Sequence, residues 1–284
     1  WFGRDVPGSR WAGDSPDFTY RTIPIAHGGS YEIHGRATCA EPPISFWSLM
    51  SDNTAAPQTL GLLESLEMDV AADGSFTITV DATPAEGRPN HLQTRPGAEF
   101  IMVRDAHADW IGQSPNALTV RRLDPDGGPK AEEAMARHAA KIAVEGVYYT
   151  YYCMQSGKGQ APNTVRPPMS SAAFGGVATQ WGTKGHLDLA DDEAIIVRSN
   201  GAGATFRNLT LTDAFHISIE YWKRTSSLNM LQLAPDDDGD FTCVVARHDP
   251  GIHNWLDTGG MRRMNFGQRW QGFAPGAVRS DPWL

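Results

Sequence analysis

The sequence of 284 residues has few cysteines and no long apolar run. Three widely spaced cysteines (Cys39, Cys153 and Cys243) exclude a disulfide framework, so we expect reduced thiols. No apolar run approaches the roughly 20 residues that span a bilayer, and no cationic leader with an apolar centre opens the chain. These absences predict a cytoplasmic protein with no membrane partner, although a start at Trp1 is also compatible with a removed targeting segment.

Basic residues are in the minority, with 24 Lys and Arg against 33 Asp and Glu and a net charge of −9. Nucleic-acid-binding domains are normally basic, so this balance predicts no nucleic-acid partner. Charged residues make up only 20% of the chain and hydrophobic residues 40%, which excludes a disordered chain and leaves ample material for a core. We therefore expect a globular protein of one large or two small domains.

The common cofactor and nucleophile motifs are also missing. The sequence contains no Gly-x-Ser-x-Gly elbow, no Walker loop and no Gly-x-Gly-x-x-Gly turn. The zinc spacings His-x-His, His-Glu-x-x-His and Cys-x-x-Cys are absent, and the acidic run Asp236–Asp240 lacks the bidentate Glu of a calcium loop. We therefore predict no cofactor and no metal, although ligands drawn from distant strands would leave no such spacing. We interpret Asp236–Asp240 as a solvated turn.

Short β-type runs punctuated by 29 glycines and 19 prolines dominate what is present. In the clearest run, Leu66–Asp81, apolar residues alternate on both sides of Asp73-Gly74, which predicts a type I′ hairpin. No internal repeat of fixed period is evident. Similar runs predict further strands over Tyr20–Ile25, Tyr31–Thr38, Ser45–Met50, Phe100–Arg104, Leu118–Leu123, Glu193–Arg198, Phe215–Trp222 and Phe241–Ala246.

One segment has helical periodicity instead. Pro129 suits a first helical position, and Lys130–Ala143 carries apolar residues at helical spacing, so we expect a helix that continues toward Tyr152. The chain is thus predicted to be mainly β, with two antiparallel β-sandwich or jelly-roll-like halves joined by one long helix. The predicted boundaries are 1–125 for the N-terminal half, 126–155 for the helical connector and 156–284 for the C-terminal half.

The densest polar run, Ala246–Gly260, follows a predicted strand in the C-terminal half. Histidine titrates near neutral pH and is the usual proton-transfer group, and a carboxylate can fix its tautomer. The predicted catalytic residues are therefore His253 and His248 for proton transfer, with Asp257 or Asp249 to orient them. The alternative is a structural corner in which the aspartates bond the local backbone.

Two further runs, Tyr221–Asn229 and Tyr148–Tyr152, can line a binding site. An arginine in the first can hold a carboxylate bidentately, and tyrosine offers an apolar ring with a hydroxyl. Each run also has a structural interpretation, because the arginine can pair with an aspartate inside the fold and the tyrosines can cement the helix onto a sheet. The predicted substrate-binding residues are Arg224, Asn229, Tyr221, Trp222, Asn254, Trp255, Arg269, Tyr148 and Tyr152.

The first half offers one weaker candidate. The run Met102–Trp110 carries Arg104, Asp105 and His107 at the end of a predicted strand, where they can reach a cleft between the halves or form a solvated turn. We interpret this run as a solvated turn.

The run His248–Gly260 resembles the signature of a bacterial family catalogued as domain of unknown function 1214, and the pair Arg269-Trp270 follows it as in that family. The segments Trp222–Asn229 and Pro16–Ile25 resemble two further elements of the same family. The resemblance is dense over Lys184–Gln271 and thinner over Ser15–Trp110.

This resemblance implies a fold rather than a mechanism. It implies two β-sandwich or jelly-roll-like halves with helical connections, without the domain of unknown function 1254 that often precedes this one in members. Members are often described beside catabolic genes for lipophilic or aromatic compounds, which is an association and not a mechanism.

Two functions of different class fit these observations. The first is an enzyme without organic cofactor, a lyase, isomerase or hydrolase that acts on a small hydrophobic or aromatic molecule by general acid–base chemistry. The second is a non-catalytic β-sandwich module that binds a carbohydrate, a lipid or a protein partner. An enclosed polar site around His253 and Asp257 favours the enzyme, whereas an exposed strip of aromatic side chains favours binding. Both are compatible with a small-molecule partner and with a homo-oligomer.

Overall fold

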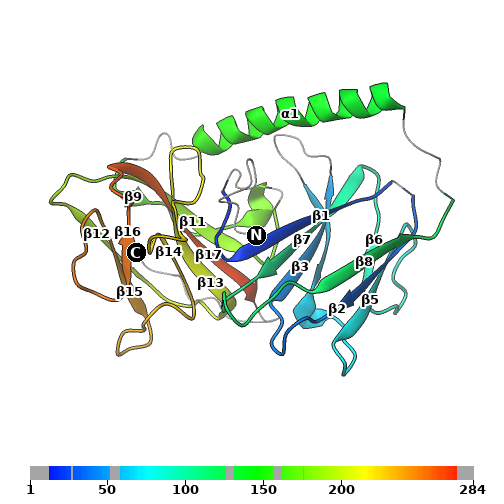
Figure 1. The fold of residues 1–284 in the computed structure, drawn as a ribbon, viewed down its shortest axis with the longest axis horizontal. Coiled ribbons are helices and arrows are strands. Elements are labelled where there is room, and N and C mark those ends of the chain that lie inside the picture. Colours follow the sequence, from blue (N-terminus) through cyan, green and yellow to red (C-terminus); the bar gives the residue numbers. More distant parts are fainter. Residues whose placement is uncertain are drawn as a thin grey trace. The chain divides into compact units, whose positions relative to one another are not determined.

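The computed structural model describes residues 13–26, 28–51, 58–125, 131–155, 161–174 and 176–273, without the side chains of residues 150, 152–155 and 174 (Figure 1). The chain forms two compact units, each mainly β. The first unit comprises Phe18–Tyr148 and Phe174–Val177, and the second comprises Trp1–Asp17, Tyr149–Ala173 and Ala178–Leu284. Residues 13–17, at the start of the described chain, thus belong to the same unit as the C-terminal half.

The first unit is a sandwich of two four-stranded sheets. One sheet has the order β1-β7-β3-β4 and the other the order β6-β5-β2-β8, and all pairs are antiparallel except β5 with β6. Both sheets contribute to one apolar core, which contains Ile33 and Ile78 from one sheet and Trp47 and Ile101 from the other. The strands are β1 (Phe18–Pro24), β2 (Tyr31–Arg36), β3 (Ile44–Ser51), β4 (Thr59–Glu64), β5 (Ser75–Asp81), β6 (His91–Gln93), β7 (Ala98–Ala106) and β8 (Ala117–Arg122), with a 3-10 turn, η1 (Ser65–Glu67), after β4.

The second unit is also a sandwich. One sheet has the order β10-β11-β17-β13-β14, with β9 on β11, and the other the order β12-β15-β16, in which β15 and β16 are parallel. The core combines Leu209 and Phe266 from one sheet with Val197 and Cys243 from the other. The elements are β9 (Thr164–Val165), β10 (Met169–Ser170), η2 (Ser171–Phe174), β11 (Trp181–Asp188), β12 (Ala194–Ser199), β13 (Ala204–Thr212), β14 (Ser227–Asn229), β15 (Phe241–Ala246), β16 (Trp255–Asp257) and β17 (Arg263–Phe273).

The two units repeat one seven-stranded topology. The order β1-β7-β3-β4 corresponds strand for strand to β11-β17-β13-β14, and β6-β5-β2 corresponds to β16-β15-β12. Even the unusual parallel pair recurs, since β6 adds to β5 as β16 adds to β15. The chain is therefore a tandem structural repeat, although its sequence shows no repeat of fixed period.

The first trace of the repeat in the sequence is a turn. Asp73-Gly74-Ser75-Phe76-Thr77 corresponds to Asp238-Gly239-Asp240-Phe241-Thr242. Gly74 and Gly239 have φ of 78° and 85°, a left-handed conformation that favours glycine. Each donates its backbone N–H to the carbonyl three residues earlier, at 2.9 Å in both copies. The turn before β5 and the acidic turn before β15 are thus structurally equivalent.

The second trace is Asn-x-Leu-x-Thr, over Asn90–Thr94 and Asn254–Thr258. Asn90 bonds both backbone groups of Asp69, accepting from N at 2.8 Å and donating to O at 2.7 Å. Asn254 likewise accepts from the backbone N of Ala234 at 2.9 Å and donates to its O at 2.7 Å. In each copy this buried amide fastens the loop before the short parallel strand to a segment twenty or so residues earlier. The identity of the asparagine is therefore fixed by the fold.

Two predicted strands are wrong. Leu66–Val70 is not the first strand of a hairpin: η1 occupies its start, Leu66 and Val70 are exposed, and β5 pairs with β2 and β6 instead. Phe215–Trp222 is mostly turn. The Asp213 side chain accepts from the N–H groups of residues 215 and 217, and His216 has φ of 59°, so the chain bends where the alternation predicts an extended strand.

The predicted helix is confirmed as α1 (Glu132–Gln155), between β8 and β9 in the chain. It carries acidic residues, Glu132 and Glu133, in its first turn, where their negative charge interacts favourably with the helix dipole. No helix in the described part of the chain is long and apolar enough to cross a membrane.

Candidate functional site

A polar row crosses the outer face of the large sheet in the second unit. Asn208 of β13 lies directly opposite Asn229 of β14 and Arg269 of β17. The alternate residues Leu209 and Leu228 belong to the apolar core. Because successive side chains point to opposite faces of a sheet, the polar row occupies the face turned away from that core. Two of its three members, Asn229 and Arg269, are predicted substrate-binding residues.

Residues 13–17 lie across this row, and we refer to them as the strap. Arg269 Nη2 donates to the carbonyl oxygen of Gly13 at 2.7 Å. Asn208 Nδ2 donates to Ser15 Oγ at 2.8 Å and to Asp17 Oδ2 at 2.6 Å, and Asn229 Nδ2 donates to Asp17 Oδ1 at 2.8 Å. The strap therefore contacts β17, β13 and β14 in turn.

The strap encloses a buried carboxylate among amides. Asp17 and Asn229 are 0% exposed and Asn208 is 1% exposed. The carbonyl oxygen of Asn208, Oδ1, is buried and has no hydrogen-bond partner among the described residues. Turning this amide over would bring its oxygen against the carboxylate of Asp17, so the contacts fix its orientation.

A second unpartnered amide lies on the same face. Gln271 is two residues beyond Arg269 on β17 and is 0% exposed. Its Nε2 donates to Gln180 Oε1 at 2.6 Å, whereas its own Oε1 is buried without a partner among the described groups. A buried acceptor left without a donor costs about 1–3 kcal/mol. The face thus presents two acceptors suited to a hydroxyl or amine.

The predicted catalytic histidines lie at the surface. His248 and Asp249 are both exposed, and Asp249 Oδ1 accepts from the backbone N–H of Gly251 at 2.7 Å. His253 is exposed as well, with Nε2 3.0 Å from the carbonyl oxygen of Gln232. No hydrogen bond joins either histidine to an aspartate within the described residues. The catalytic assignment stays a prediction.

Asn254 and Trp255 bond the backbone instead of facing a site. Besides its two bonds to Ala234, Asn254 Nδ2 donates to the carbonyl of Thr242 at 3.0 Å. The indole N–H of Trp255 donates to the carbonyl of Ala246 at 3.0 Å. Their polar side-chain atoms are therefore engaged in holding β16 beside β15.

Arg224 and Asp257 are brought together. Arg224 Nη1 lies 3.3 Å from Asp257 Oδ2, and its Nε lies 3.3 Å from Glu220 Oε2. The guanidinium hydrogen bond holds the pKa of Glu220 below its ordinary value. Nearby, the rings of Tyr221 and Trp222 pack edge to face with centroids 5.1 Å apart. Arg224 is thus shared between two carboxylates of its own unit, as in the structural interpretation of this run.

Tyr148, a predicted binding residue of α1, is open to solvent. Tyr148 is 62% exposed and its neighbour Tyr151 is 60% exposed. The side chain of Tyr152 lies outside the described residues. Two rings of the helix are thus open to solvent.

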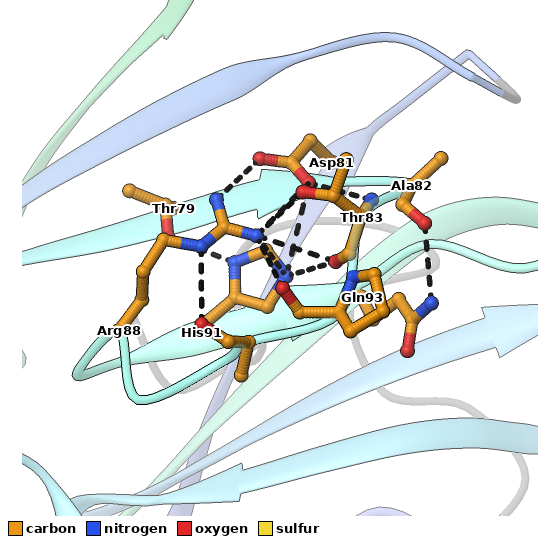
Figure 2. Close-up of polar contacts among 9 residues, drawn as sticks. Thr79, Asp81, Ala82, Thr83, Arg88, His91 and Gln93 are labelled. Carbon is orange, nitrogen blue, oxygen red and sulfur yellow. Dashed lines mark hydrogen bonds and ion pairs between the residues drawn. The ribbon is translucent and has the colours of Figure 1, made fainter.

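In the first unit, the densest polar network closes the loop between β5 and β6 (Figure 2). Arg88 donates to Asp81 Oδ2 at 2.7 Å and to the hydroxyl of Thr83 at 2.6 Å. The hydrogen bond from Arg88 holds the pKa of Asp81 well below its ordinary value. His91, with 1% of its side chain exposed, contacts Thr79 Oγ1 at 2.8 Å and the carbonyl of Thr83 at 2.9 Å. These groups satisfy one another, so the network braces a loop.

Asp105 and His107 do not form a solvated turn, which corrects that interpretation. Asp105 lies within β7 and is 0% exposed, with Oδ2 2.5 Å from Arg21 and Oδ1 accepting from the hydroxyl of Ser45. His107 is 8% exposed, and burial lowers its pKa. Arg104 donates to Ser48 on the opposite face of the sheet. No three His, Cys, Asp or Glu side chains are grouped to hold a metal ion in the described ranges.

Comparison with known families finds a match within the first unit. The model of a family described as "Protein of unknown function (DUF1214)" matches residues 22–107. This match confirms the predicted resemblance. The DUF1214 match covers β1 to β7, which is one seven-stranded copy, and lies where the resemblance in sequence is thinner. The run His248–Gly260 lies outside the matched residues.

Two solved structures share the fold. An uncharacterised protein from Burkholderia cenocepacia aligns with a TM-score of 0.82 and 24% identity, over 96% of this chain and 77% of the other. A protein from Vibrio parahaemolyticus aligns with a TM-score of 0.53 and 10% identity, over 98% and 91%. At these identities the likeness concerns the fold alone. No curated protein matches the sequence.

Proposed function

We propose that this protein binds a small molecule with hydroxyl or amine donors on the strap-covered face of the second unit. One observation carries the proposal: the buried carbonyl oxygen of Asn208 has no donor among the described residues, while the amide nitrogen of the same side chain is held by Asp17. Gln271 adds a second such oxygen on the same face. A ligand that donates two hydrogen bonds offsets the cost of both groups.

The recurring topology supports a specialised role for this face. In the first unit, the positions that correspond to Asn208 and Asn229 are held by Phe46 and Glu64, which oppose each other on β3 and β4. The amide row is therefore particular to the second copy and is not required by the fold. Polar groups that the fold does not require are the better candidates for function.

The acid–base enzyme expected from the sequence receives less support from the geometry. His253 is exposed and bonded to a backbone carbonyl, and Asp257 is engaged by Arg224 and by the N–H of Gly259. The histidine and the aspartate are not joined by a hydrogen bond in the described residues. Catalysis on a small hydrophobic or aromatic molecule thus remains a prediction, with His253 as its test residue.

Gln271 and Gln268 provide a matched pair of variants on β17. Each is 0% exposed, donates through Nε2 to one side chain and leaves Oε1 without a described partner. Gln268 belongs to the core side of the sheet, because it opposes Leu209, whereas Gln271 belongs to the outer face. We would screen phenols, benzyl alcohols, small polyols and primary amines by saturation-transfer NMR.

We expect a bound hit to lose about tenfold in affinity with Gln271→Met, which corresponds to about 1.4 kcal/mol. The same hit should bind the Gln268→Met protein as it binds the wild type. Loss of one hydrogen bond to a ligand explains this size of effect. Absence of any hit, or equal effects of the two substitutions, would refute the proposed site. Activity that depends on His253 and not on Gln271 would favour the enzyme instead.

A further inference from the structure

One arginine on the inner face of the second sandwich has no carboxylate beside it. Arg207 of β13 shares a face with Leu209 and Leu211, which belong to the apolar core, because alternate residues of a strand share a face. Its guanidinium lies over the ring of Phe241 of β15, 5.3 Å from the centroid, in a cation–π contact between the two sheets. Arg207 is only partly buried, so part of its side chain remains open to solvent.

The guanidinium has no hydrogen-bond acceptor among the described residues. Nε is buried without a partner, and neither Nη atom forms a hydrogen bond or an ion pair within that part of the chain. Burial lowers the pKa of Arg207, and no described carboxylate opposes this effect. In the turn before β15, Asp236 accepts from the hydroxyl of Thr242, and Asp238 pairs with Arg198. These nearby carboxylates are therefore engaged elsewhere.

The first unit shows how a partly buried arginine is neutralised at this end of a sandwich. The side chain of Arg21 on β1 is 27% exposed, and its Nη2 lies 2.5 Å from Asp105 Oδ2. The other oxygen of Asp105 accepts from the hydroxyl of Ser45, and this carboxylate is completely buried. The first copy thus supplies a carboxylate from its own chain.

The second unit lacks this carboxylate at the equivalent position. Positions 207 and 45 correspond, since each precedes the residue already matched between β13 and β3. Ser45 opposes Asp105 across β3 and β7, whereas Arg207 opposes Trp270 across β13 and β17. An indole has no acceptor atom, and the N–H of Trp270 donates to the carbonyl of Asn200 at 3.0 Å. The place of the carboxylate is therefore held by a ring that cannot neutralise Arg207.

Gly201 leaves space beside the guanidinium. A Cβ built at this position would lie 2.5 Å from Nη1 of Arg207. The φ of Gly201 is outside the left-handed region, so its backbone conformation does not require glycine. The missing side chain thus leaves Nη1 uncovered on the side of the turn between β12 and β13.

We infer that Arg207 binds the carboxylate of a small molecule at this end of the second sandwich. A guanidinium holds a carboxylate through two parallel, charge-assisted hydrogen bonds. The ligand carboxylate takes the role that Asp105 has beside Arg21 in the first copy. The site lies on the inner face of the sheet, whereas Asn208 and Gln271 lie on the outer face, so it does not depend on the function proposed above.

The side-chain Nε–H signal of Arg207 in ¹H–¹⁵N spectra of the full chain tests this site, and its disappearance in Arg207→Lys assigns it. Benzoate is the probe, and benzamide at the same ionic strength is the matched ligand, because it keeps the ring and lacks the charge. We expect benzoate to shift the signal saturably and benzamide to leave it in place. The signals of Arg21 and Arg198, each paired with a carboxylate, should stay unchanged.

Two substitutions change the site in different ways, so that a folding defect in one does not decide the outcome. Arg207→Gln removes the charge and should weaken benzoate binding, followed by saturation-transfer NMR, by about tenfold or more. Gly201→Ala places a methyl group against Nη1 and displaces the guanidinium, and it should weaken binding by about threefold with an unchanged circular dichroism spectrum. Arg198→Gln and Gln271→Met should each leave the dissociation constant at the wild-type value.

Four results would overturn the inference. The first is the absence of a saturable shift at up to about 50 mM benzoate, a limit that corresponds to negligible affinity. The second is equal binding of benzamide, which assigns recognition to the ring. The third is tighter binding of inorganic phosphate, which means a general anion site. The fourth is a shift of the Arg207 signal in ligand-free Asp281→Asn protein, which assigns the carboxylate to a residue of this chain outside the described ones.

Discussion

The substitution Asn254→Asp tests whether the run His248–Gly260, which contains this asparagine, stabilises the fold or serves catalysis. It keeps the size of the side chain but replaces a donor by an acceptor. Asn254 is 6% exposed, and its Nδ2 donates to the carbonyls of Ala234 and Thr242. In the variant, a carboxylate oxygen faces both carbonyls, so two partly buried acceptors lose their donor and a charge is placed beside them.

Each lost hydrogen bond costs about 1 kcal/mol, and a buried acceptor left unpaired costs about 1–3 kcal/mol. We therefore expect Asn254→Asp to lower the free energy of unfolding by about 3–5 kcal/mol at pH 7. The loss should shrink in acid, because protonation of the new carboxyl returns one donor. Urea denaturation followed by circular dichroism at pH 7 and pH 3 measures both quantities.

Two controls accompany this substitution. Asn90→Asp removes one donor bond, to the carbonyl of Asp69, and should cost about 2–3 kcal/mol in the first unit. Asp257→Asn breaks a partly exposed ion pair with Arg224 and should cost less than about 1 kcal/mol. If Asn254→Asp leaves the stability at the wild-type value, the structural role argued for this asparagine is wrong.

Three further results are expected. The hydrogen bond from Arg88 lowers the pKa of Asp81 from 3.8 in the folded state, so ionised Asp81 stabilises the fold fully above about pH 4, and this stabilisation is lost as the pH falls through the folded pKa. Asp81→Asn should therefore flatten the decline of the free energy of unfolding between pH 4 and pH 2, and an unchanged slope would contradict this. Arg88→Lys should lower the urea midpoint of the first unit, because lysine cannot reproduce the fork that reaches Asp81 and Thr83 together. An unchanged midpoint would mean that this contact is dispensable for stability. Burial raises the pKa of Cys243 to about 12, so iodoacetamide at pH 8 should modify the partly exposed Cys39 and spare Cys243 in the folded protein, as peptide mapping can show.

The sequence predicts those strands in which one face points to solvent and the other to the core. In β2, residues on the core side, such as Ile33, alternate with exposed or half-buried ones, and the alternation is visible in the sequence. In β17 residues on both faces are buried, including Asn265, Phe266 and Gln268, so apolar residues do not alternate and the central strand gives no signal. The pattern over Phe215–Trp222 fails for the opposite reason, because local turn contacts override it.

The repeat is hidden for a related reason. The residues that the two copies share include those that the backbone demands, such as the glycine of the turn before β5 and β15 and the asparagine before β6 and β16. The spacing between these two positions differs by one residue, Gly74 to Asn90 against Gly239 to Asn254, so no fixed period survives. Topology is conserved here by a few backbone contacts while most of the core side chains differ.

Only the part of the proposed site around Asn229 and Arg269 is predictable from the sequence. Asn229 and Arg269 stand beside the family-like motifs and are named as binding residues on that basis. Asp17 and Asn208 are not predicted, because the strap meets its sheet across 191 residues and neither position has a local pattern of its own. Long-range contacts of this kind leave no periodicity to read.

The strap also sets an order of events during synthesis. Gly13 and its partner Arg269 are 256 residues apart in the chain. At roughly 5–20 residues per second, the ribosome needs about 13–50 s to supply that partner. The first unit can complete its own sandwich meanwhile, whereas the amide face of the second unit becomes covered only when the last strand is in place. A nascent chain therefore exposes this face until β17 has been made, which leaves time for a ligand to enter before the cover closes.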